Sequence, residues 1–127
     1  MAPTLRLLHV EDEPDIREIT EFALEDEGFA LTQCASGAEA LARAQHTHFD
    51  VMLLDVMMPG IDGPDTLRAL RQLPHLAATP AIFMTAKVQP AEVVALKAAG
   101  ALAVIAKPFD PLGLADEIRG ILARNAD

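Results

Sequence analysis

The sequence is constrained most by residues 51–55, where four consecutive apolar side chains lead directly to a carboxylate, Asp55. Successive side chains of a strand point to opposite faces of the sheet, so a strand that is apolar at every position is covered on both sides. Such a strand is typical of the centre of a parallel sheet, and residues 57–60 (Met-Met-Pro-Gly) predict a turn after it. Because open α/β sheets bind ligands at the carboxyl ends of their strands, we interpret Asp55 as a nucleophile held at a ligand site.

Four more apolar runs give the chain a regular alternation of strands and helices. Strands are expected at residues 5–10, 29–34, 51–55, 81–85 and 102–106. Helices are expected from Pro14 to Gly28, from the N-cap Ser36 to near His46, over residues 65–73, over residues 90–100, and from the N-cap Asp110 with Pro111 in the first turn. This alternation predicts a parallel sheet with helices on both faces, and we expect a single α/β domain over residues 1–127.

The composition argues against two classes of function. A formal net charge of −9 disfavours direct binding to nucleic acid, which needs a basic surface. No apolar run approaches the roughly 20 residues of a membrane span. The single cysteine, Cys34, and an N-terminus without a secretion-signal pattern suit a reducing cytoplasm. We therefore expect a cytoplasmic protein that binds cations or docks on a basic partner, without nucleic-acid contact or membrane insertion.

Reactive side chains stand at the carboxyl ends of four expected strands: Glu11 and Asp12, then Asp55, then Thr85, then Lys107. In a parallel sheet these ends share one edge, so the side chains can converge. Three close carboxylates repel one another unless a cation intervenes, and oxygen ligands without His or Cys favour Mg²⁺. A carboxylate beside Mg²⁺ and an ammonium group suits phosphoryl transfer, with an aspartyl phosphate on Asp55 as the product and Thr85 as a hydrogen-bond donor to one phosphoryl oxygen.

Four motifs at these strand ends together resemble the receiver domain of two-component response regulators. They are Val10-Glu11-Asp12-Glu13-Pro14, the run LDVMMPGIDG at residues 54–63, Met84-Thr85-Ala86 and Lys107-Pro108-Phe109. Each motif alone is weakly specific, but the four in order, across the whole chain, are highly specific. The resemblance implies a flavodoxin-like fold, a doubly wound (βα)5 domain whose five-stranded parallel sheet has the order 2-1-3-4-5.

The resemblance also implies a metal site. Asp12 and Asp55 would bind Mg²⁺ directly, together with the backbone carbonyl of Met57. Glu11 would act mainly through a water molecule.

On the same basis, Asp55 would accept a phosphoryl group from a sensor histidine kinase or a histidine phosphotransfer protein. Lys107 would contact the phosphoryl group, Thr85 would move toward it, and the Lys107–Pro108 peptide would be cis. The protein would be no enzyme beyond catalysing its own phosphorylation and dephosphorylation, and would signal through a downstream protein target or a self-dimer.

Two positions depart from the commonest family pattern. Glu11 stands where aspartate is more usual, and Val104 stands where many members carry Tyr or Phe. The aromatic ring of those members turns inward when the threonine moves. Because Val104 has no such ring, we predict switching through backbone shifts of the fourth strand and the helix after it, without a rotamer flip at residue 104.

Several alternatives stay open from the sequence. A chain from Met1 to just past the last helix weakly favours a stand-alone regulator over a receiver cut from a longer regulator or hybrid kinase. A degenerate receiver that binds partners without phosphate is a second possibility, which the intact set of Asp12, Asp55, Thr85 and Lys107 disfavours. An aspartyl phosphatase would usually carry a second aspartate at position 57, where this chain has a methionine. A flavin-binding electron carrier would need a hydroxyl-rich loop after the first strand, where this chain has Glu11-Asp12-Glu13. Both alternatives are therefore disfavoured.

The helix at residues 90–100 offers a candidate partner surface. Its residues Ala91, Val94, Ala95 and Ala98 share one face, which we expect to lie against the sheet. Val93 and Leu96 would then face solvent, where exposed apolar side chains often mark an interaction site. By the family resemblance, this helix, the fifth strand and the last helix would form the dimer or partner face.

Overall fold

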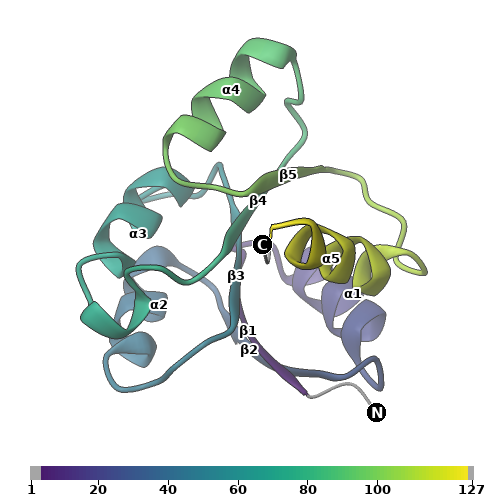
Figure 1. Cartoon of the computed structure of the whole chain (residues 1–127), viewed down its shortest axis with the longest axis horizontal. Helices are drawn as coiled ribbons and strands as arrows, with labels where there is room; N and C mark the ends of the chain where they lie inside the picture. Colours follow the sequence, from purple (N-terminus) through teal and green to yellow (C-terminus); the bar gives the residue numbers. More distant parts are fainter. Residues whose placement is uncertain (1–3, 126–127) are drawn as a thin grey trace.

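The five apolar runs form a parallel sheet in the computed structural model, which describes residues 4–125 (Figure 1). The strands are β1 (Leu5–Val10), β2 (Phe29–Cys34), β3 (Val51–Asp55), β4 (Ala81–Thr85) and β5 (Ala103–Ala106). Their order across the sheet is β2-β1-β3-β4-β5, which confirms the predicted flavodoxin-like arrangement. All residues of the central strand β3 are buried, as its apolar sequence predicts.

Helices cover both faces of this sheet. They are α1 (Pro14–Leu24), α2 (Gly37–Ala44), α3 (Gly63–Leu70), α4 (Pro90–Ala98) and α5 (Leu114–Arg124), with a short 3-10 helix, η1 (Pro74–Leu76), before β4. Figure 1 shows α1 and α5 on one face, α2 and α3 on the other, and α4 beyond β4 and β5 at one edge. The architecture is therefore three layers, helices over sheet over helices.

The alternation of side chains along β3 divides the interior into two hydrophobic cores. Met52 and Leu54 pack into the core under α2 and α3, with Leu67 of α3 among their neighbours. Val51 and Leu53 belong to the other core, under α1 and α5. Each fully buried aliphatic side chain of this size contributes about 1.5–3 kcal/mol relative to an exposed one. Packing on both faces thus holds β3 in place, and this fixes the position of Asp55 at its end.

The start of α2 follows the predicted capping pattern with one difference. Ser36 Oγ accepts a hydrogen bond from the N–H of Glu39 at 3.1 Å, as the capping-box spacing predicts. The carboxylate of Glu39 reaches one residue further than expected and accepts from the N–H of Ala35 at 2.8 Å. The helix ends at Ala44, short of the predicted His46.

Three other helix boundaries differ from the prediction by at least three residues, because local turns end or delay the helix. α1 leaves the helical conformation at Glu25, whose φ and ψ are −65° and 143°, well before Gly28. α3 ends at Leu70 and the chain continues into η1, so the helix does not reach residue 73. α5 begins at Leu114, because Asp110 accepts hydrogen bonds from the N–H groups of Leu112 (3.0 Å) and Gly113 (3.1 Å) and closes a separate turn.

The prediction that Val93 and Leu96 face solvent is wrong. Leu96 is only 9% exposed and belongs to the core under α2 and α3, and Val93 is partly buried. Val94, expected against the sheet, is 68% exposed. The reason is the size of the side chains: burying one leucine removes more apolar area from water than burying alanines, so the helix turns Leu96 inward and leaves its alanine-rich face outside.

Candidate functional site

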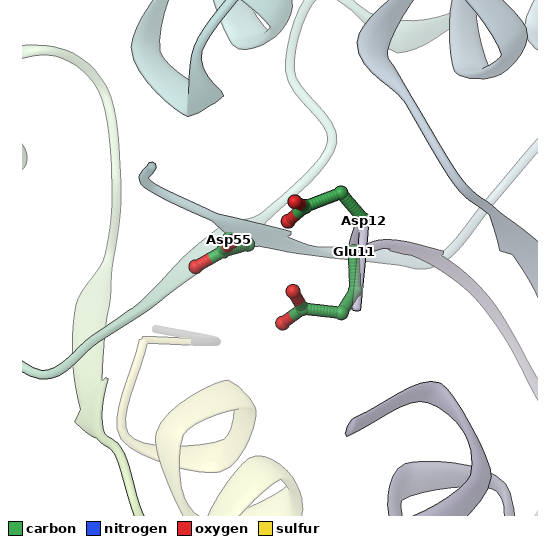
Figure 2. Close-up of side chains that lie close together, drawn as sticks. All are labelled: Glu11, Asp12 and Asp55. Atoms are coloured by element: carbon green, nitrogen blue, oxygen red, sulfur yellow. The ribbon is translucent and has the colours of Figure 1, made fainter. Parts of the chain in front are cut away.

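Three carboxylates converge at the carboxyl ends of β1 and β3. Glu11 and Asp12 directly follow β1, Asp55 is the last residue of β3, and one oxygen of each lies within 4.8 Å of the others. Figure 2 shows the carboxyl groups of Glu11 and Asp12 extending from the same turn toward Asp55. Glu11 and Asp55 are buried, whereas Asp12 is partly exposed. The predicted convergence of these strand ends is therefore present in the structure.

Lys107, which follows β5, neutralises part of this negative charge. Its Nζ lies 2.8 Å from Glu11 Oε1 and 2.8 Å from Asp55 Oδ1. Burial alone would lower the pKa of Lys107, but the hydrogen bonds to Asp55 and Glu11 outweigh it and raise the pKa, so the ammonium stays charged. The peptide between Lys107 and Pro108 is cis, as the family resemblance implies.

One lysine leaves the cluster short of positive charge. Burial, reinforced by the charge of Asp55 and opposed by the bond to Lys107, raises the pKa of Glu11 to about 7. Asp12 Oδ1 is buried and has no hydrogen-bond partner among the described residues. A buried carboxylate oxygen normally has a partner, and a bound cation supplies one. The three carboxylates could therefore bind a metal ion, and their hard oxygen donors suit a hard divalent cation.

A small pocket gives access to Asp55. Its volume is about 190 Å³, and it is lined by Glu13, Asp55, Met57, Thr85, Ala86, Lys87 and Lys107. Thr85, the last residue of β4, is 5% exposed and its Oγ1 accepts a hydrogen bond from the N–H of Lys87 at 3.0 Å. Met57 is 65% exposed at the mouth of the pocket. The pocket thus places Asp55, Thr85 and Lys107 around one space that is open to solvent.

The loop after β3 folds back onto the backbone of Asp55. The N–H of Gly63 donates to the carbonyl of Val56 at 2.8 Å, and a Cβ on Gly63 would collide with the carbonyl oxygen of Asp55. Only glycine fits at this close approach. Asp62 then caps α3 by accepting from the N–H of Asp65 at 2.9 Å. The Gly-Ile-Asp-Gly turn of the sequence is therefore part of the support of Asp55.

A family model described as the response regulator receiver domain matches residues 7–119 of this chain. The chain belongs to this family. Its sequence is 39% identical to the transcriptional regulatory protein CseB of Streptomyces coelicolor, over 98% of this chain and 52% of that protein. It is 37% identical to the transcriptional regulatory protein ResD of Bacillus subtilis, over 94% of this chain and 48% of that protein.

Solved structures support the same membership. The chemotaxis response regulator CheY4 of Vibrio cholerae superposes with a TM-score of 0.88 at 34% identity, covering 94% of the receiver and 99% of that chain. The receiver spans about half the length of the curated relatives it matches. Within residues 4–125, no helix combines the length and the apolar character needed to cross a membrane. The chain is thus a signalling module of the two-component type.

Two neighbours of the site were not recognised in the sequence. Arg17 of α1 donates hydrogen bonds to the carbonyl oxygens of Glu11 and Asp12. Gln33 of β2 contacts both Arg17 and His9. An arginine one turn into a helix that follows an acidic turn is a usable signal, but which atoms it binds depends on the tertiary structure.

Proposed function

We propose that the receiver accepts a phosphoryl group on Asp55, in a reaction that depends on Mg²⁺, and relays the signal by a conformational change. The supporting observation is the convergence of Glu11 and Asp12 with Asp55 and Lys107, of which Asp55 and Lys107 line an open pocket. A buried oxygen of Asp12 has no hydrogen-bond partner among the described residues. Family membership supports the same reaction. Beyond its own phosphorylation and the hydrolysis of the resulting aspartyl phosphate, we propose no enzymatic activity.

The chain's own residues account for the steps of the transfer. A carboxylate oxygen of Asp55 forms a bond to phosphorus, the phosphorus–nitrogen bond of a phosphohistidine donor breaks, and the electron pair stays on the donor's nitrogen. Lys107, whose Nζ lies 2.8 Å from Asp55 Oδ1, then pairs with the negatively charged phosphoryl oxygens. Thr85 donates a hydrogen bond to one of these oxygens. Bound Mg²⁺ would neutralise charge on the transferring phosphoryl group.

The proposed metal ligands combine the acidic cluster of the structure with what membership of the receiver family implies. Asp12 and Asp55 would hold Mg²⁺ directly, with the backbone carbonyl of Met57 as a third ligand and Glu11 acting through water. Two carboxylates and a phosphoryl oxygen match the ligands that Mg²⁺ prefers. The raised pKa of Glu11 agrees with a role that does not require its full negative charge.

The donor is a sensor histidine kinase or a histidine phosphotransfer protein. A candidate docking face lies on α1, where Ile19 and Phe22 are 41% and 62% exposed beside Pro111 and the acidic side chains of Asp15 and Glu18. An apolar patch with an acidic rim suits a partner whose own patch has a basic rim. Single exposed apolar residues are normal, but two on one helix face beside a hollow support an interface.

The output differs from the usual aromatic switch. Val104 is partly buried against the core under α2 and α3. Because a valine has no aromatic ring, the inward ring rotation of other family members has no counterpart at this position. We propose that phosphorylation acts through shifts of β4 and α4, with a downstream protein or a second copy reading the change through the α4–β5–α5 face. The domain would extend over residues 1–127 and work in the cytoplasm.

The deciding experiment is intact-mass spectrometry after incubation with acetyl phosphate. Wild type should gain one phosphoryl group only when Mg²⁺ is present, and Asp55→Asn should gain none. Asp65→Asn, which removes an exposed carboxylate of α3, is the matched control and should behave as wild type. Labelling of Asp55→Asn at the wild-type rate would refute the site. If the wild type is not labelled but still binds Mg²⁺, the site requires a protein donor.

A further inference from the structure

Arg17 lies against the turn that carries the two adjacent acidic residues. Its Nη1 donates to the carbonyl oxygen of Glu11 at 2.8 Å and to that of Asp12 at 3.1 Å. Both carbonyls therefore point to one guanidinium group. Their side chains leave the same turn toward Asp55 (Figure 2). Arg17 touches the backbone of the acidic pair, and the hydrogen bonds of the structure place none of its contacts on the carboxylates.

The backbone of Arg17 is itself held in place by Gln33 of β2. Gln33 Nε2 donates to the carbonyl oxygen of Arg17 at 2.8 Å and lies 3.1 Å from His9 Nδ1. Because the carbonyl of Arg17 can only accept, the amide nitrogen of Gln33 must be at this end, and its second hydrogen is directed to His9. α1, β1 and β2 are thus tied together directly behind the acidic turn.

This arrangement answers an electrostatic difficulty. Glu11 and Asp12 are consecutive, and their carboxylates must approach both each other and Asp55 to within 4.8 Å. Without a restraint, repulsion would favour backbone conformations that separate them. Two hydrogen bonds from one charged nitrogen, Nη1, to consecutive carbonyls restrict the turn. This nitrogen lies one atom further along the side chain than the Nζ of a lysine, so a lysine at this position would not reach both carbonyls in the same way.

We propose that Arg17 is a positioning residue, which holds the Glu11–Asp12 turn in the conformation that binds the divalent cation. The inference rests on the proposed metal site. It adds Arg17 of α1, which is not itself one of the proposed metal ligands. It assigns Gln33 a supporting role, because Gln33 fixes the backbone of Arg17.

The test is the affinity for Mn²⁺ and Mg²⁺ of Arg17→Lys, which keeps the positive charge but ends one atom closer to the backbone. Residues that orient metal ligands typically change affinity about 10–100-fold when they are replaced, so we expect a Kd for Mn²⁺ at least about 10-fold higher than wild type. Water-proton relaxation reports Mn²⁺ binding, and calorimetry reports Mg²⁺. Arg68→Lys is the matched control: within residues 4–125 the ion-pair partner of Arg68 is the exposed Asp65 of α3, so both affinities should stay unchanged.

A second variant, Gln33→Ala, should raise the Kd in the same direction by a smaller factor. It keeps the inference testable if Arg17→Lys folds poorly, and urea unfolding of every variant separates loss of fold from loss of affinity. A folded Arg17→Lys protein with the wild-type Kd would overturn the positioning role and leave the metal site intact. If the wild type binds neither metal, the metal site fails, and the role of Arg17 with it.

Discussion

Two buried groups of β1 and its turn should give this receiver opposing dependences of stability on pH. Burial, with smaller contributions from the charges of Lys107 and Arg17, lowers the pKa of His9 from 6.5 to about 3. Burial and the charge of Asp55 raise the pKa of Glu11 from 4.5 to about 7. Both side chains are fully buried, so solvent screens neither of them strongly.

The signs follow from which state binds the proton. Between about pH 3 and pH 6.5 the unfolded chain protonates His9 and the folded chain does not, so His9 makes stability fall as the pH falls. Between about pH 4.5 and pH 7 the folded chain keeps Glu11 protonated while the unfolded chain ionises it, so Glu11 makes stability fall as the pH rises. Each slope approaches about 1.4 kcal/mol per pH unit, and the two cancel where the windows overlap.

Single substitutions should separate the two slopes. When the pH is raised from about 5 to about 6, the unfolding free energy of His9→Gln should fall by about 1 kcal/mol relative to the change in wild type, because only the slope of Glu11 remains. Over the same rise in pH, the unfolding free energy of Glu11→Gln should increase by about 1 kcal/mol relative to the change in wild type, because only the slope of His9 remains. Because the receiver has no Tyr or Trp, urea unfolding is followed by far-UV circular dichroism, with EDTA present to exclude metal ions. Comparing each variant with itself at two pH values removes the packing change that the substitution causes. If both variants differ from wild type by the same amount at both pH values, the buried charges do not act as described.

Two further predictions concern α4 and Lys107. Leu96→Ala should lower the unfolding free energy by about 2–5 kcal/mol because it empties a core position, whereas Val94→Ala, on the exposed face, should change it by less than about 0.5 kcal/mol; equal effects in urea titrations would contradict the orientation of α4. Lys107→Ala should still gain phosphoryl mass on Asp55 but lose most of the chemical-shift change that phosphorylation causes in α4, measured by NMR. Lys97→Ala, on the exposed side of α4, is the control and should retain both.

The candidate site could be predicted because it depends on strand ends. An all-apolar strand must be covered on both faces, and alternation with helices makes the strands parallel, so the residues after β1, β3, β4 and β5 share one edge. That reasoning places Asp12, Asp55, Thr85 and Lys107 together without knowledge of any distance. The four motifs then supply the family and the strand order.

The orientation of α4 could not be predicted in the same way. Its sequence is apolar nearly all round, so two faces compete and the periodicity does not choose between them. The choice depends on the core under α2 and α3, which Leu96 joins together with Leu67 and Phe83. A leucine fills space in this core that an alanine would leave empty. The start of α5 was predicted wrongly for a related reason, because Asp110 and Pro111 are equally common in a turn and at a helix N-terminus.

The sheet, its two covered faces and the residues at its reactive edge follow from the amino-acid sequence alone, because periodicity and strand-end position are properties of the chain. Tertiary structure alone decided that Arg17 binds the carbonyls of Glu11 and Asp12, that His9 is buried beside Gln33, and that Asp12 keeps a buried oxygen without a partner among the described residues. These contacts join α1, β1 and β2 through side-chain reach and local charge, and neither quantity is encoded in the spacing of residues along the chain.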